Sequence, residues 1–218
     1  MVCALRENNS IDDSKKTIID GLKNFFIAKG TIEYVDSELK KISTQAKELE
    51  LDWKLGDLSK DALEQELEKL NLKFEKLKEL KNTANKTLKE NYIPERYLQE
   101  LENNTKKLDK LNELKSKKAI SKAAYKEYKK AISQRIKELK KLLREIVQEL
   151  KHIKRDILND LKRLNVEKDH IFVAYSINEL SQDEYFLHQN EITMKIFIYK
   201  NAADLIEKYI RKIKETIK

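Results

Sequence analysis

Residues that end or bend helices are scarce in this sequence. The 218-residue chain contains 3 glycines and 1 proline. Because these two residue types supply most turns and helix ends, the helices between them must be long. The chain also has a single cysteine, Cys3, so an intrachain disulfide or a zinc site built from several thiols is excluded within this sequence. No stretch reaches the roughly 18 uncharged residues that a bilayer span requires. We therefore expect a soluble, cytoplasmic protein.

Charged and aliphatic residues are abundant instead. Charged residues make up 39% of the chain, with 46 basic and 38 acidic side chains. This composition is typical of long helices and coiled coils. The predicted fold class is all-α, with elongated antiparallel helical hairpins or a coiled-coil bundle.

Three serines share one sequence context that predicts helix starts. Each follows an apolar residue and precedes another apolar or aromatic residue by four positions. A serine oxygen caps the first turn, and the flanking pair forms a hydrophobic staple. The starts are Leu58-Ser59 with Leu63, Ile120-Ser121 with Tyr125, and Leu180-Ser181 with Tyr185. Their spacing of 62 and 60 residues either reflects an internal repeat or is simply how stapled helix starts look.

The predicted organisation has three parts. Residues 1–30 form an N-terminal helical segment that Gly30 and Thr31 interrupt. Residues 31–118 form antiparallel helical hairpins, with one helix from Ser59 to Glu90 and a fresh start at Pro94, where Tyr92 staples to Tyr97. Residues 119–218 contain a long basic helix that breaks at 165–169 and a C-terminal heptad helix.

Apolar residues at steps of three and four predict the buried face of each helix. In the first helices this seam comprises Ile32, Val35, Leu39, Ile42, Ala46, Leu49 and Trp53, and then Leu63, Leu67, Leu70, Phe74 and Leu77. In the long basic helix the seam runs from Tyr125 and Tyr128 to Leu164. Tyr125 and Tyr128 are predicted core residues. The C-terminal seam is the most regular. It is either the internal core of the bundle or a partner and oligomer contact, and its residues are Ile192, Ile196, Tyr199, Ile206, Ile210, Ile213 and Ile217.

The positive charge is concentrated in one helix. Residues 119–165 carry 14 basic and 6 acidic side chains, so their net charge of +8 equals that of the whole chain. Seven basic residues lie off the apolar seam and form a candidate polyanion-binding stripe: Lys130, Lys137, Lys141, Arg144, Lys151, Arg155 and Lys162. Such a stripe is suited to weak contact with DNA, RNA or an anionic membrane. The simpler interpretation is a solvated helix face, because only 7 of the 46 basic residues are arginine.

No catalytic or metal-binding pattern occurs in the sequence. His152, His170 and His188 lack a histidine partner at helical spacing, and the glycines are scattered singly. We therefore expect no enzymatic activity, no cofactor, no metal site and no small-molecule substrate.

The segment from Lys115 to Tyr128, KSKKAISKAAYKEY, follows a leucine-seamed helix. It resembles the hairpin turns of the archaeal CdvA-like coiled-coil family, and the resemblance covers about residues 59–164. Proteins of that family act in a cell-division apparatus built around ESCRT-III-like polymers, through self-assembly and membrane association. The resemblance implies a role in division or membrane remodelling and assigns no site residues.

Together these patterns favour a non-enzymatic coiled-coil scaffold or self-associating assembly component. Two alternatives remain open. One is a nonspecific nucleic-acid or anionic-membrane binder that uses the basic helix. The other is a regulatory subunit that docks a helical partner on the C-terminal seam.

Overall fold

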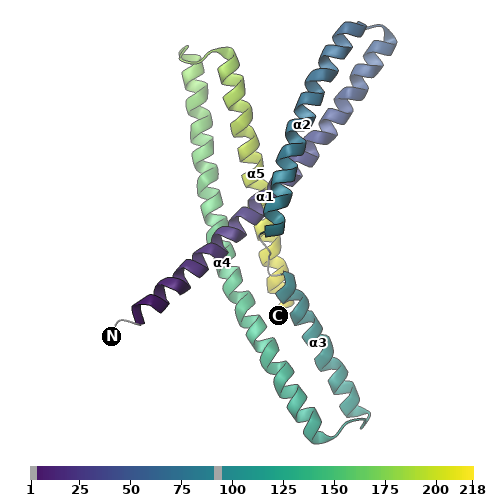
Figure 1. Ribbon diagram of the computed structural model, residues 1–218, viewed down its shortest axis with the longest axis vertical. Coiled ribbons are helices and arrows are strands. Elements are labelled where there is room, and N and C mark those ends of the chain that lie inside the picture. Colours follow the sequence, from purple (N-terminus) through teal and green to yellow (C-terminus); the bar gives the residue numbers. More distant parts are fainter. Residues whose placement is uncertain (1–3, 91–94) are drawn as a thin grey trace. The chain divides into compact units, whose positions relative to one another are not determined.

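The computed structural model describes the backbone of residues 4–90 and 95–218, and the side chains of residues 21–89 and 95–218. These residues form five helices and no strand: α1 (Ala4–Leu55), α2 (Lys60–Glu90), α3 (Glu95–Ser116), α4 (Lys122–Ser176) and α5 (Gln182–Thr216) (Figure 1). The prediction of an all-helical protein is confirmed. Cys3, the predicted stop at 91–94 and the Tyr92 staple lie outside the described residues.

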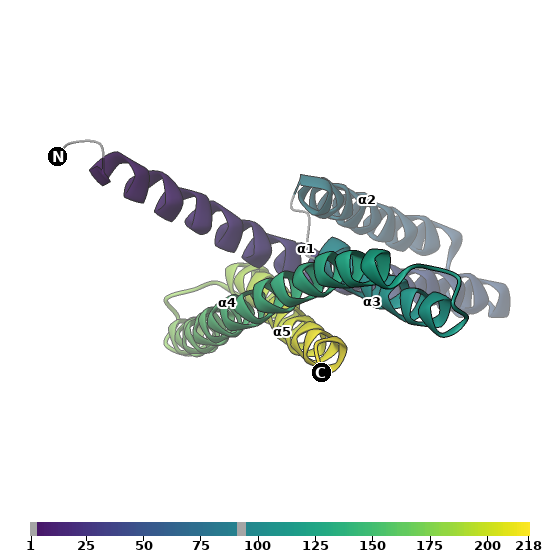
Figure 2. The same ribbon diagram turned by 90° about the horizontal axis from the view of Figure 1, so that it is seen from below.

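The chain divides into two compact units. Unit 1 combines residues 1–92 with 156–205, and unit 2 combines residues 93–155 with 206–218. Helices α4 and α5 are long enough to contribute one part to each unit (Figures 1 and 2).

Three turns in the chain have the same backbone geometry. They follow α1, α3 and α4, and each begins with a residue at positive φ: Gly56 (86°), Lys118 (54°) and Asn178 (62°). In each turn this residue donates its N–H to the carbonyl three positions back, and the next residue donates to the carbonyl five positions before it. These two bonds satisfy carbonyls at the C-terminal end of the helix, which have no partner within it. The next helix starts after a serine three positions later in all three cases.

The three predicted serine caps are confirmed. Ser59 Oγ accepts from Ala62 N at 3.2 Å, and Ser121 Oγ accepts from Ala124 N at 3.2 Å. Ser181 has the full capping box, because its Oγ accepts from Glu184 N at 3.3 Å while its own N–H donates to Glu184 Oε2 at 2.9 Å. These bonds satisfy N–H groups that the first turn of each helix leaves unpaired.

In unit 1, α1 and α2 lie side by side. Their buried contact is formed by Val35, Ile42 and Leu77. Glu38 reinforces it from within, because its carboxylate pairs with Lys41 of α1 at 2.6 Å and with Lys73 of α2 at 2.8 Å. Burial raises the pKa of Glu38, but the hydrogen bonds from both lysines outweigh burial, and the net effect lowers it.

The predicted interruption at Gly30 and Thr31 is wrong, because α1 runs unbroken from Ala4 to Leu55. Gly30 instead marks a close approach between α1 and α5. A Cβ atom at Gly30 would lie 2.5 Å from the carbonyl oxygen of Ile198 and 3.2 Å from the backbone nitrogen of Ala202. Because glycine has no Cβ atom, the backbones of α1 and α5 can approach each other closely at this position. Nearby, the rings of Tyr34 and Phe197 meet edge to face at 5.5 Å.

The predicted break at 165–169 is also wrong, because α4 continues to Ser176. Asn165 does not end the helix, since its side-chain amide donates to the carbonyl of Leu161 at 2.8 Å within the same helix. The segment contains neither glycine nor proline, so nothing in it removes a helical hydrogen bond.

In unit 2, α3 packs on the first part of α4. Leu98, Leu101 and Leu111 of α3 are buried, as are Leu139, Leu143 and Leu150 of α4. Tyr125 is buried as predicted, and its hydroxyl donates to Asn112 Oδ1 at 2.9 Å.

Three residues assigned to buried seams are exposed: Trp53, Phe74 and Tyr128. Tyr128 lies three residues after the buried Tyr125, but 62% of it is exposed. Helical spacing places a residue on the apolar face of its own helix. The residue is buried only where another helix packs over that position.

Candidate contact surfaces

The C-terminal seam is mostly buried within the chain. Ile192, Ile206, Ile210 and Ile213 are each at most 3% exposed. Ile196, Tyr199 and Ile217 are half-buried. In unit 2, Lys154 Nζ of α4 lies 2.9 Å from Glu207 Oε2, which brings α4 beside the end of α5. This burial favours an internal role for the seam over a free docking face.

The basic stripe lies on solvent. Lys130, Lys137, Lys141, Arg144, Lys151, Arg155 and Lys162 are all exposed. Lys141 pairs with Glu145 at 3.9 Å, Lys151 donates to Gln148 Oε1 at 3.4 Å, and Arg155 approaches His152 Nδ1 at 3.0 Å. Exposed pairs of this kind contribute little to stability. The stripe is therefore a charged surface rather than part of the packing.

The two units carry opposite net charge. Unit 2 has 24 basic and 11 acidic residues, a net charge of +13, whereas unit 1 has 22 basic and 27 acidic residues, a net charge of −5. Residues 119–155 of α4 and the turn before it supply a net charge of +8, Lys117 and Lys118 add +2, and the end of α5 adds +3, whereas the charges of α3 cancel. Most of this charge already lies in the continuous segment 117–155, and unit 2 adds the basic end of α5 to it.

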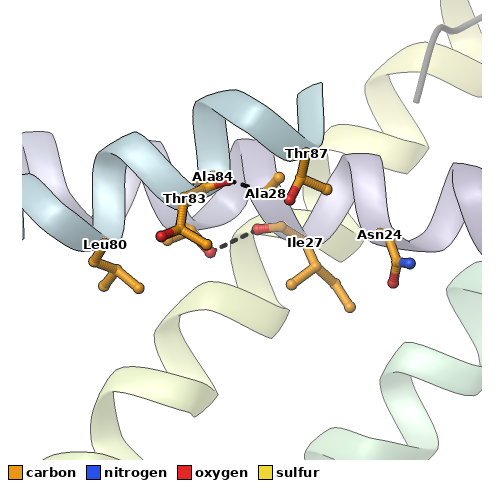
Figure 3. A pocket seen from close by; sticks show the side chains of 8 residues that line it. Asn24, Ile27, Ala28, Leu80, Thr83, Ala84 and Thr87 are labelled. Carbon is orange, nitrogen blue, oxygen red and sulfur yellow. Dashed lines mark hydrogen bonds between the residues drawn. The ribbon is translucent and has the colours of Figure 1, made fainter. Parts of the chain in front are cut away.

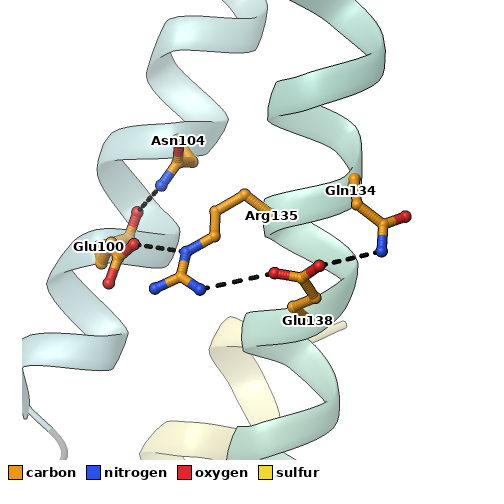
Figure 4. A network of polar contacts seen from close by, with 5 residues as sticks. All are labelled: Glu100, Asn104, Gln134, Arg135 and Glu138. Atoms are coloured by element: carbon orange, nitrogen blue, oxygen red, sulfur yellow. Dashed lines mark hydrogen bonds and ion pairs between the residues drawn. The ribbon is translucent and has the colours of Figure 1, made fainter.

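Some cations of unit 2 are already used to join its helices. Arg135 Nε of α4 donates to Glu100 Oε1 of α3 at 2.7 Å, and Arg135 Nη1 lies 3.5 Å from Glu138 Oε2 (Figure 4). The hydrogen bond from Arg135 lowers the pKa of Glu100, and the hydrogen bond from Lys154 lowers that of Glu207. Arg135 and Lys154 are therefore structural cations, and neither belongs to the predicted stripe.

The densest positive charge lies at the α3–α4 turn. Residues 115–130 contain seven lysines and one acidic residue, Glu127. We call these seven lysines the lysine turn, and all of them are exposed. They are Lys115, Lys117, Lys118, Lys122, Lys126, Lys129 and Lys130. Lys115 Nζ lies 4.3 Å and Lys129 Nζ lies 5.4 Å from the centre of the Tyr125 ring. These cation–π contacts hold two of the lysine side chains against the buried ring.

The equivalent positions of the other two turns are acidic. Residues 53–68 contain two basic and five acidic residues, and residues 175–190 contain three acidic residues and neither lysine nor arginine. One backbone geometry therefore presents opposite charge in the two units.

Exposed apolar side chains gather beside the two acidic turns, both in unit 1. Leu51, Trp53 and Leu55 lie just before the α1–α2 turn, and Leu55 is 66% exposed. Five more flank the α4–α5 turn: Phe172, Val173, Ile177, Phe186 and Leu187, of which Leu187 is 68% exposed. We call the two groups the apolar turns. Exposed apolar side chains grouped in this way favour a protein contact.

A groove of about 250 Å³ lies between α1 and α2 (Figure 3). Its walls are apolar apart from Asn24 and three threonines. Thr31, Thr83 and Thr87 each donate their hydroxyl to a carbonyl one turn earlier in their own helix. The threonine protons are thus engaged within the helices, and the groove has no charged group in its lining.

In the described part of the chain, no cluster of three or more histidine, cysteine, aspartate or glutamate residues is arranged to hold a metal ion. Nor does any helix in that part contain an apolar stretch of the length needed to cross a bilayer.

Sequence reasoning missed the lysine turn and the apolar turns as surfaces. The charge was followed along one helix, although the signal was present in KSKKAISKAAYKEYKK at 115–130. The apolar turns were absorbed into predicted seams or left unassigned.

Comparisons of the chain with protein-family models, with characterised proteins and with solved structures give no match.

Proposed function

We propose that this protein is a non-enzymatic, self-associating helical scaffold, built from antiparallel coiled-coil hairpins. One observation supports this most strongly: among the described residues, eight of the fourteen exposed large hydrophobic side chains lie beside the two turns of unit 1, while the C-terminal seam is mostly buried. A scaffold needs contact surfaces that remain free after its own core is complete. The apolar turns have that property, and the C-terminal seam does not.

The occupant we propose for the apolar turns is a second copy of this chain. Each copy carries two such turns with the same backbone geometry, so one copy offers another a surface of matching chemistry. Both turns are acidic, which opposes their contact at low ionic strength. Association through them should therefore strengthen as salt screens the like charges.

The process that the scaffold serves is proposed from the resemblance of residues 115–128 to the CdvA-like family. That resemblance supports a division or membrane-remodelling assembly.

Sedimentation velocity over a concentration series tests the proposal. The double variant Leu55→Gln/Leu187→Gln changes two exposed residues, so the fold should be unaffected. We expect larger species in the wild type that grow with concentration and with salt, and their loss in the double variant. Leu72→Gln is the matched control, because Leu72 is 60% exposed but lies away from the turns. A wild type that stays monomeric throughout, or a control that behaves like the double variant, would refute the proposal.

A further inference from the structure

The lysine turn has one backbone feature that sets it apart from its two equivalents. The first residue of each turn adopts positive φ, and in the other two turns this residue is Gly56 or Asn178. Glycine and asparagine are the residues that tolerate this conformation best, whereas the Cβ atom of lysine opposes it. Lys118 nevertheless occupies it, with φ of 54°. The turn therefore carries an additional positive charge at a position where glycine or asparagine would cost less.

The surrounding charge points to an anionic ligand. Residues 115–130 contain seven lysines and one acidic residue, and none of the seven lysines has an ion pair among the described residues. Seven lysines within sixteen residues repel one another, and a polyanion that binds them releases their counterions and relieves this repulsion.

The basic stripe continues the same surface along unit 2. Lys130 belongs to both the turn and the stripe, and the stripe runs along α4 as far as Arg155 within this unit. At 1.5 Å per residue, the exposed cations from Lys130 to Arg155 follow a straight path of about 40 Å. A chain of phosphates is the ligand that matches a row of cations of this length.

Exposed apolar residues distinguish a nucleic acid from a bilayer. The turns of unit 1 expose leucine, isoleucine and phenylalanine, which are the residues that insert into lipid. At the lysine turn the large exposed hydrophobic residue is Tyr128. Its phenol ring, next to Lys129 and two residues from Lys126, has the chemistry to stack on a nucleobase while the lysines contact phosphates.

We propose that the lysine turn and the adjoining stripe of unit 2 bind the phosphate backbone of nucleic acids, without base specificity, and that Tyr128 stacks on an unpaired base. The proposal does not depend on self-association, because it rests on unit 2 and the apolar turns belong to unit 1. Lysine supplies point charges and lacks the planar fork of arginine, so sequence discrimination is not expected.

Fluorescence anisotropy with a labelled single-stranded oligonucleotide of mixed sequence tests this proposal in the full chain. The triple variant Lys117→Gln/Lys122→Gln/Lys126→Gln should raise Kd at least about tenfold at low salt and reduce the slope of log K against log salt by roughly 2. The matched control Lys76→Gln/Lys86→Gln/Lys89→Gln removes the same charge from exposed positions of α2 in unit 1. We expect its Kd to change by less than about twofold.

A second pair of variants separates binding from folding. Lys118→Gly should raise the midpoint of thermal unfolding, because it relieves the positive φ, and yet weaken nucleic-acid binding. Asn178→Gly at the equivalent turn should leave binding unchanged. Tyr128→Ala should weaken binding of the single strand more than binding of a duplex.

Four outcomes would overturn the proposal. The first is that the wild type fails to bind nucleic acid at low salt. The second is that the two triple variants lose affinity equally. The third is that the lysine-turn variant loses binding to vesicles of phosphatidylcholine and phosphatidylserine while its nucleic-acid binding is unchanged. A lysine-turn variant that loses only self-association would likewise show that the turn contacts the acidic turns of another copy.

Discussion

Lys118 occupies the same position in the α3–α4 turn that Gly56 occupies in the α1–α2 turn. Both have positive φ, both donate their N–H to the carbonyl three residues back, and both precede a serine cap by three residues. The backbone of the two turns is therefore equivalent, and their charge is opposite. The two turns thus share one backbone geometry and differ in the charge of the side chains that they expose to solvent.

The start of α4 should depend on Tyr125 and not on Tyr128. Tyr125→Ala removes a buried ring, its hydrogen bond to Asn112 and its contacts with two lysines, so we expect a loss of about 3 kcal/mol in the free energy of unfolding. Ser121→Ala should cost about 1 kcal/mol, the usual contribution of a cap. Urea unfolding measures both. Tyr128→Ala is the control and should stay within about 0.5 kcal/mol of the wild type, as is usual at exposed sites.

Glu38 should make stability depend on pH. Folding lowers its pKa below the ordinary value of 4.5, so the carboxylate stabilises the protein at neutral pH. That contribution is lost as the pH falls from about 4.5 through the lowered value. Glu38→Gln should cost about 1–3 kcal/mol at pH 7, because it breaks charged hydrogen bonds to two helices. The difference from the wild type should shrink toward zero in acid, whereas Glu75→Gln, in an exposed pair within α2, should show little effect at either pH. If the loss of unfolding free energy in Glu38→Gln, relative to the wild type, were the same in acid as at pH 7, this prediction would be wrong.

Gly30→Ala should destabilise the protein, although alanine is the better helix former by about 1 kcal/mol. The new Cβ would lie 2.5 Å from the carbonyl oxygen of Ile198, so the backbones of α1 and α5 must move apart. We expect a net loss of about 1–3 kcal/mol in chemical denaturation, the range for overpacking. At Gly56 a Cβ would meet nothing within 4 Å, and the cost there is the positive φ alone. A stabilised Gly30 variant would show that α1 and α5 do not approach at this point.

Placing charge in the C-terminal seam distinguishes core from interface. Ile206 and Ile213 are fully buried, so Ile206→Glu/Ile213→Glu forces two carboxylates into an apolar core. We expect loss of helicity by circular dichroism, or aggregation. A soluble, fully helical species of lower mass in light scattering would instead identify the seam as the assembly contact.

Local features were predictable from the sequence, and the three serine starts show why. A cap depends on a few neighbouring residues, so Ser59, Ser121 and Ser181 could be placed without knowledge of the fold. The long buried seams were predictable for the same reason, because helical spacing is a property of one segment.

Several errors arose where a distant segment decides the outcome, whereas the predicted break at 165–169 overlooked the local absence of glycine and proline. Gly30 was expected to interrupt a helix, but the backbone of α5 explains the glycine, and no local pattern shows that approach. Trp53 and Phe74 fit their seams by spacing but lie where no neighbour covers them. The lysine turn was missed for another reason: its charge is continuous in the sequence, but it is divided between the end of one helix and the start of the next.

The central claim is that copies of this chain meet through the apolar turns of unit 1. Hydrogen–deuterium exchange of the wild type at low and high protein concentration tests it most directly, because amides near a turn exchange quickly until a partner covers them. We predict that concentration slows exchange around residues 51–58 and 172–187 and leaves residues 192–217 unchanged. Protection that increases only at 192–217, or at no segment at all, would contradict the claim.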